Sequence, residues 1–133
     1  MLEAKVIACS VQQGAKELYE MLWAPESFPK WASGLSSTML EKDGANWKAQ
    51  GPEGPIHIRF SDHNSFGVMD HWIELGEGLV LYVPLRIIAN MDGSEVLLTL
   101  FRQPGMSAEK FAEDEAWVRK DLASLKALAE RKQ

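Results

Sequence analysis

The stretch that decides the fold is GVMDHWIELGEGLVLYVPLRIIANMDGSEVLLTLF, residues 67–101. It contains runs rich in β-branched and aromatic residues, which is the composition of β-strands. Short turns separate these runs, at Gly76-Glu77-Gly78 and again at Asp92-Gly93. Such turns join antiparallel neighbours, because parallel strands need a long crossover connection. The stretch therefore predicts an antiparallel meander with strands over residues 67–75 and 79–89 and a third strand that begins at residue 94.

The sequence before this stretch adds further strands and two short helices. Residues 3–11 have strand composition, apolar residues at helical spacing predict a helix over residues 12–23, and PESFPKW (25–31) predicts a short helical turn. Asp43-Gly44 is a hairpin signal between TMLEK and ANWKAQ, and GPEGP at residues 51–55 marks another reversal. The meander therefore extends to both sides of the deciding stretch.

Residues 107–131 form the longest predicted element, a helix with Ser107 as its N-cap. One face carries an apolar stripe: Phe111, Val118, Leu122, Leu125 and Ala129. Only this helix is large enough to cover a sheet face. The sequence therefore predicts an α+β domain spanning residues 1–133, in which a strongly curved seven-stranded antiparallel sheet wraps around one long C-terminal helix.

Composition and charge exclude several classes of protein. The 133 residues carry 19 acidic side chains against 14 Lys and Arg, a formal net charge of −5, and the basic residues are scattered, so we expect no nucleic-acid partner. Cys9 is the one cysteine, which excludes an internal disulfide and a multi-cysteine zinc site. The spacing of His57, His63 and His71 does not suit a metal, and no phosphate-binding glycine loop is present, so we expect no metal and no cofactor.

The sequence also favours a soluble location. Residues 1–5 lack the basic and long apolar parts of a signal peptide. No run approaches the roughly 18 apolar residues of a membrane span. We therefore expect a cytoplasmic protein without integral membrane association.

Alternation along the strands predicts which side chains face the interior. A three-residue loop at 76–78 sets His71 opposite Val83, and a two-residue turn at Asp43-Gly44 sets Leu40 opposite Trp47. A two-residue turn at Asp92-Gly93 points Arg102 inward, whereas one added loop residue would reverse the faces of the last strand. The predicted interior is an apolar cavity between the sheet and the C-terminal helix, lined by Trp31, Leu40, Trp47, Ile58, Phe60, Met69, Ile73, Val83, Leu85 and Leu122.

His71 is the one polar group expected among these apolar side chains. Burial keeps an imidazole neutral, so His71 could bond a ligand carbonyl or act as a general acid or base. The alternative is a core histidine bonded to a backbone group or to water, which is the commoner role of a lone histidine.

Asp70 and Arg86 form a second polar pair. The hairpin register places both on the outer face, within reach of a salt bridge. The alternative is a β-bulge near Pro84 that turns Arg86 inward to bind a ligand carboxylate. Arg86 and Arg102 are therefore candidate ligand-orienting residues beside His71.

Four segments together resemble a known superfamily. These are VQQGAKELYEMLWAPESFPKWASGL (11–35), FGVMDHWIEL (66–75), VPLRIIANMDGSEVLLTLFRQPGMS (83–107) and FAEDEAWVRKDLASLKALAE (111–130). They are similar to the helix-grip fold of the START/Bet v 1 superfamily (SRPBCC), more closely its polyketide cyclase/dehydrase-like branch of small bacterial proteins. The resemblance implies the helix-grip fold over nearly the whole chain. It does not fix the activity, because relatives include lipid carriers, hormone receptors, aromatase/cyclases and co-chaperones.

Three functions follow as hypotheses. The leading one is binding of a small apolar or aromatic molecule, lipid- or polyketide-like, in the cavity. The second is a cyclase or dehydrase in which His71 moves a proton, and the third is a co-chaperone-like interaction protein. The outward side chains Trp72, Val80, Tyr82 and Ile88 would also suit a homodimer.

Overall fold

The computed structural model describes residues 1–33, 40–51, 54–76 and 78–131. It contains two α-helices, α1 (Ala15–Leu22) and α2 (Ala108–Glu130), and the 3₁₀-helix η1 (Pro25–Lys30). The strands are β1 (Ala4–Val11), β2 (Glu41–Asp43), β3 (Asn46–Gly51), β4 (Gly54–Phe60), β5 (His71–Glu74), β6 (Val80–Val83), β7 (Leu85–Asn90) and β8 (Gly93–Phe101).

All strand pairs are antiparallel and form two sheets, in the orders β1-β8-β7 and β2-β3-β4-β5-β6. The strand predicted over residues 79–89 is split at Pro84 into β6 and β7, so the described residues contain eight strands rather than seven. Proline lacks the N–H that a central strand must donate. The two sheets still meet here, because Thr99 N donates to Pro84 O over 3.0 Å and Met69 N donates to Leu85 O over 2.8 Å.

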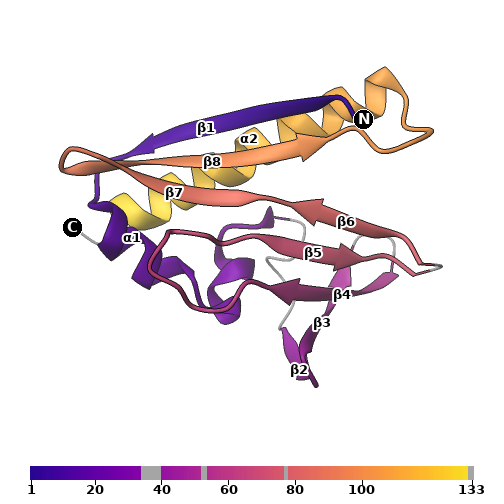
Figure 1. The fold of residues 1–133 in the computed structure, drawn as a ribbon, viewed down its shortest axis with the longest axis horizontal. Helices are drawn as coiled ribbons and strands as arrows, with labels where there is room; N and C mark the ends of the chain where they lie inside the picture. The colour runs from indigo at the N-terminus through magenta and orange to yellow at the C-terminus, as the bar shows by residue number, and fades with distance from the viewer. Residues whose placement is uncertain (34–39, 52–53, 77, 132–133) are drawn as a thin grey trace.

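The long helix begins and packs as the sequence predicts. Ser107 caps α2, with its Oγ accepting a hydrogen bond from Lys110 N over 3.0 Å. Figure 1 shows α2 running behind β1 and β8, while α1 and η1 lie at the side of the five-stranded sheet. The buried side chains of α2 are Phe111, Leu122, Leu125 and Ala129. The helix-grip arrangement expected from the sequence is therefore present, with α2 held mainly by the three-stranded sheet.

The predicted faces of β8 are confirmed even though its turn moves. Asn90 pairs with Gly93, so the turn is Met91-Asp92 rather than Asp92-Gly93. Because both residues of the pair that closes the turn move by one position, the same side chains of β8 still face inward and the same ones outward. Val96 and Leu98 are accordingly buried, and His71 lies opposite Val83 as predicted.

The predicted pairing of Leu40 with Trp47 is wrong. Trp47 lies opposite Lys42, because the turn falls at Gly44-Ala45 and Asp43 pairs with Asn46. Lys42 Nζ sits 5.1 Å from the centre of the Trp47 ring. Leu40 precedes β2 and still packs against the core, since a shift of two residues keeps the same face.

Candidate functional site

The most distinctive interior feature is a cluster of aromatic rings around His71. His71 is the first residue of β5 and is 3% exposed. The ring of Phe28, from η1, meets it nearly edge-on at 5.0 Å between centroids, and Phe60, from β4, lies at 5.9 Å. Trp31, immediately after η1, packs edge-on against Phe28 at 5.1 Å. The Pro-bounded turn at residues 25–30 thus delivers two aromatic rings onto the sheet.

Two ring nitrogens in this cluster lack a good hydrogen-bond partner. Trp31 is 4% exposed, and its Nε1 is buried with no acceptor among the described residues. His71 Nδ1 has one long contact, 3.5 Å to Met69 O. Buried polar groups are almost always satisfied, so an orphan of this kind calls for an explanation.

Burial also decides the protonation of His71. Desolvation lowers its pKa to about 4, against the smaller raising effects of the Met69 carbonyl and of Asp70. The imidazole is therefore neutral at physiological pH, with one nitrogen donating and the other accepting. A neutral ring suits hydrogen bonding to a ligand. It is a weak proton acceptor, because a general base works best with a pKa near the operating pH.

The space left among these side chains is small. A pocket of about 10 Å³ is bounded by α1, η1, β4 and the residues around the start of β5. A volume of this order holds about one water molecule. The pocket lies against η1 rather than against α2 as expected, because Leu122 and Leu125 of α2 are themselves packed into the core, 2% and 0% exposed.

The predicted cavity residues divide into those that line this pocket and those that do not. Trp31, Phe60, Met69, His71 and Leu85 line it. Ile58 and Leu122 are buried elsewhere in the core, and Leu40, Ile73 and Val83 pack against the core with partial exposure. Trp47 is partly exposed and lies outside the pocket, beside Lys42. The helical stripe and the Pro-bounded turn indicated buried faces but did not reveal that their side chains line the pocket, among them Tyr19, Leu22, Trp23 and Phe28.

Beside the pocket, Asp70 organises the break between β6 and β7. It is 4% exposed and accepts four hydrogen bonds: Arg86 Nε and Nη2 at 2.8 and 2.7 Å, Tyr82 Oη at 2.8 Å and Leu85 N at 2.9 Å. Burial raises the pKa of the Asp70 carboxyl, but the hydrogen bonds from Arg86, Tyr82 and Leu85 outweigh it and hold the pKa below its usual value. The carboxylate thus replaces the strand pairing lost at Pro84.

This geometry decides between the two expectations for Arg86. Its side chain is 46% exposed and pairs with Asp70 from the outer face. The alternative of a bulge that turns Arg86 inward is therefore wrong, because Leu85 and Ile87 are the buried residues on either side of it. The predicted salt bridge between Asp70 and Arg86 is confirmed, but Asp70 is buried rather than exposed.

Arg102 also lies outside the pocket. Its Nε donates to Met106 O over 3.0 Å, and its Nη1 lies 3.3 Å from Glu3 Oε1. Arg102 follows the end of β8, so strand alternation no longer dictates its direction. The expectation that it points inward with Leu100 is not met.

The outward apolar residues lie where alternation places them. Val80, Tyr82 and Ile88 are 49%, 38% and 50% exposed. Trp72 stacks on Tyr82 at 5.3 Å between centroids, with the Arg59 guanidinium 4.0 Å from its ring centre. Self-association through this face stays a prediction.

The described residues contain neither a cluster of metal-ligating side chains nor a membrane-spanning helix. No group of three or more His, Cys, Asp or Glu side chains could hold a metal ion there. No helix in the described part of the chain is long and apolar enough to cross a membrane.

Comparisons with known proteins identify the fold. No protein-family model and no curated protein sequence matches the chain. Among solved structures, an uncharacterized protein from Bacillus thuringiensis matches with a TM-score of 0.74 at 15% identity, over 95% of this chain and 98% of that one. A START superfamily protein from Mycobacterium smegmatis matches with a TM-score of 0.73 at 8% identity, over 98% and 99%.

A third match is the di-domain ARO/CYC protein BexL from the BE-7585A biosynthetic pathway. Its TM-score is 0.67 at 15% identity, and the match covers 95% of this chain and 46% of BexL. Together these structures show that the chain has the helix-grip fold of the START/Bet v 1 (SRPBCC) superfamily, in an α+β arrangement. At such low identity the likeness establishes the fold alone.

Proposed function

We propose that the protein binds a small apolar or aromatic molecule that carries one hydrogen-bonding oxygen. The ligand would enter between η1 and strands β4 and β5, with its ring body among Phe28, Phe60 and Met69. Apolar burial, worth roughly 25 cal/mol per Å², would supply most of the affinity.

The observation that carries this proposal is the buried, unpaired Nε1 of Trp31. An unsatisfied buried donor costs about 1–3 kcal/mol, and a ligand oxygen that accepts from it would recover that cost. The neutral imidazole of His71 lines the same pocket and offers a second polar contact. An apolar pocket with a few placed polar groups is the usual form of a small-molecule site.

The small size of the pocket sets a condition on binding. Because about 10 Å³ cannot hold an aromatic ring, η1 has to move outward when the ligand enters. The free protein is then mostly in the closed state, which lowers the apparent affinity by the fraction that is open.

The acid/base alternative for His71 is less well supported. A pKa of about 4 leaves little driving force for proton abstraction at neutral pH. The other titratable side chains that line the pocket are engaged elsewhere: Tyr19 Oη accepts from Asn64 N, and Asp70 accepts from Arg86, Tyr82 and Leu85.

Three naphthalene compounds test the proposal: naphthalene, 2-naphthol and 2-acetylnaphthalene, titrated by tryptophan fluorescence. The two oxygen-bearing compounds should bind about tenfold more tightly than naphthalene, because only they can pair with Trp31 Nε1. Trp31→Phe keeps an aromatic side chain, although a smaller one, and removes the donor, so it should abolish this difference. Trp117→Phe, on the exposed face of α2, is the matched control. Equal affinities for all three compounds in the wild-type protein would refute the proposal.

A further inference from the structure

A rigid loop at one end of the molecule holds a phenylalanine in solvent. The loop, residues 61–70, is organised by Asn64. Asn64 Oδ1 accepts from Phe66 N and Val68 N over 2.9 and 3.1 Å, and its Nδ2 donates to Asp62 O and Val68 O over 2.9 Å each. Asn64 N donates to Tyr19 Oη of α1 over 2.9 Å. The loop backbone is thereby fixed to itself and to α1.

Gly67 clamps the same loop to β7. Ile87 N donates to Gly67 O over 2.9 Å, and a Cβ on Gly67 would lie 2.2 Å from Ile87 O. Its φ of +72° is also a conformation that favours glycine. Despite this tight anchoring, the neighbouring Phe66 is 80% exposed. A large apolar side chain on a fixed backbone is pre-organised for binding, because little conformational freedom remains to be lost.

Phe66 borders an open groove of about 960 Å³ between α1, the loop and β7. Apolar side chains from β7 and α1 contribute to its wall, including Ile88, which is 50% exposed. The β7–β8 turn next to the groove carries Met91, which is 93% exposed and lines the neighbouring hollow. Met91 has a φ of +54°, where glycine would be expected. Phe66 and Ile88 therefore give the groove wall an exposed apolar part, beside the charged side chains of Lys16 and of the Glu20–His63 pair.

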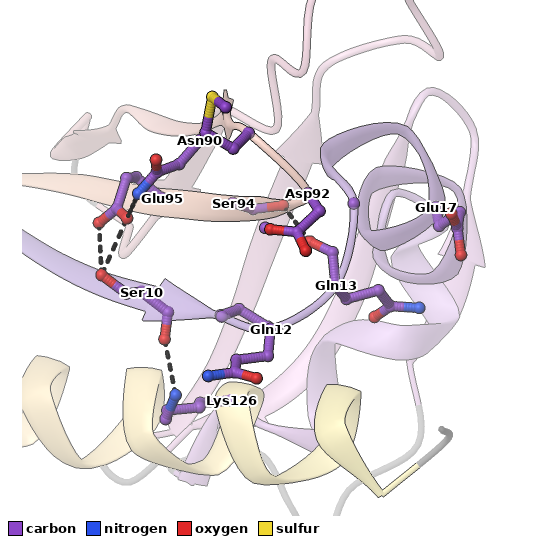
Figure 2. Close-up of a pocket in the computed structure, with 13 residues that line it drawn as sticks. Ser10, Gln12, Gln13, Glu17, Asn90, Asp92, Ser94, Glu95 and Lys126 are labelled. Carbon is purple, nitrogen blue, oxygen red and sulfur yellow. Dashed lines mark hydrogen bonds between the residues drawn. The ribbon is translucent and has the colours of Figure 1, made fainter.

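An acidic hollow lies at the β7–β8 turn, which follows the β7 wall of the groove, and Figure 2 shows the side chains that line the hollow. The carboxylates of Glu17, Asp92 and Glu95 line it, in a volume of about 920 Å³. The one lysine on its wall is Lys126, whose Nζ is held by Ser10 O and by Glu130 Oε2 at 2.7 and 2.8 Å. Its charge is thus already matched, and the hollow presents net negative charge.

We propose that this end of the molecule is a docking surface for a protein segment that places a large apolar side chain beside Lys or Arg residues. The surface, which we call the Phe66 surface, comprises Phe66, Ile88 and Met91 with Glu17, Asp92 and Glu95. The apolar side chain seats in the groove and the cations lie over the acidic hollow. Such complementarity gives partner selection and steers encounter.

Two other occupants fit less well. Anionic lipid would meet the same carboxylates and be repelled. In a symmetric dimer, a second copy would bring an identical acidic hollow against this one or its near neighbours. A cationic, apolar segment is the occupant that satisfies both parts of the surface.

Three fluorescein-labelled 12-residue peptides test this proposal by fluorescence polarisation. One carries a central Trp flanked by Lys in a Gly/Ser background, the second has Glu in place of Lys, and the third has Ala in place of Trp. The Lys–Trp peptide should bind saturably, and the other two about tenfold more weakly or less. Phe66→Ser and Glu17→Lys should each weaken the Lys–Trp peptide by about tenfold. Trp117→Ser, also at an exposed apolar residue but on α2, should leave it unchanged.

Thermal melting of each variant checks that it is folded, which is expected because the substituted side chains are exposed. The proposal is overturned if the Lys–Trp peptide shows no saturable binding at protein concentrations up to about 1 mM, which corresponds to a very weak affinity. So does equal binding of the Ala peptide, or an unchanged affinity in Phe66→Ser. A wild-type dimer that Phe66→Ser converts to a monomer, measured by light scattering, would assign the surface to a second copy and also overturn it.

Discussion

The interior of the molecule differs between the region where α2 packs on the strands and the region where η1 packs on them. Where α2 packs on β1 and β8, the interior is closed by aliphatic side chains such as Ile7, Val96 and Leu125, each 2% exposed or less. Where η1 packs on β4 and β5, the interior is aromatic and contains His71 and the unpaired Trp31 Nε1. The first side is built for stability, whereas the second keeps unsatisfied polar atoms that a purely structural core would lack.

The largest expected effect is on the α2 side. Leu125→Ala, at 0% exposure, should lower the free energy of unfolding by about 2–5 kcal/mol, because it removes apolar contacts and leaves a cavity. Urea denaturation measures this. A loss below about 1 kcal/mol would mean that α2 does not pack against the sheet as described.

The junction between the two sides should be nearly as sensitive. Asp70→Ala leaves Leu85 N without its acceptor and removes the partner of Arg86, so about 3 kcal/mol of stability should be lost. Arg86 is half exposed and can be solvated alone, so the carboxylate side is the costly one to remove. Glu74→Ala, at the exposed end of β5, is the control and should change stability little. Equal losses in both variants would contradict the role assigned to Asp70.

Burial of His71 makes stability depend on pH. The unfolded state protonates His71 near pH 6.5 and the folded state only near pH 4, so the unfolded state binds more protons between these values. The free energy of unfolding therefore falls as the pH drops through this window, by about 2 kcal/mol at pH 5 from this residue.

Burial also raises the pKa of the Asp121 carboxyl, so His71 is not the one buried group whose protonation affects stability. The comparison that isolates His71 is the wild type against His71→Leu, by urea denaturation at pH 7 and pH 5. The variant should lose less stability between the two pH values. Parallel losses would show that His71 is accessible to protons in the folded state.

The smallest effect is expected at the unpaired donor. Trp31→Phe should leave stability unchanged or raise it by up to about 1 kcal/mol, because it removes a buried N–H that has no acceptor. Loss of packing around the smaller ring works against this gain. Thermal unfolding of the variant measures the balance, and a loss above about 2 kcal/mol would indicate that the indole N–H is bonded in the free protein.

Side-chain alternation was sufficient to predict the faces of the strands. It placed His71 opposite Val83 and turned Val96 and Leu98 inward, and the helical stripe with Ser107 located α2. The turn near Asp92 lies one residue earlier than predicted. Alternation could not fix its position, because two-residue turns centred one residue apart leave the same side chains of the strands facing inward. The fold was predictable because each of these patterns is local.

The site was predictable only in part. The Pro-bounded turn indicated that Phe28 and Trp31 are presented together, but alternation cannot show that Trp31 Nε1 lacks a partner. Alternation also assigned Asp70 to an exposed face. It does not take into account the hydrogen bonds that become available where the strand is interrupted at Pro84. The size of the pocket depends on packing between distant segments, which no local pattern contains.

The most direct measurement is the ¹H–¹⁵N spectrum of the indole N–H groups of the five tryptophans during titration with 2-acetylnaphthalene. Trp31→Phe identifies the Trp31 signal by its disappearance. The account predicts that this signal shifts downfield and saturates at one equivalent, because the indole gains a hydrogen-bond acceptor, while naphthalene leaves it without that downfield shift. An unshifted Trp31 signal at concentrations where fluorescence shows binding would contradict the account.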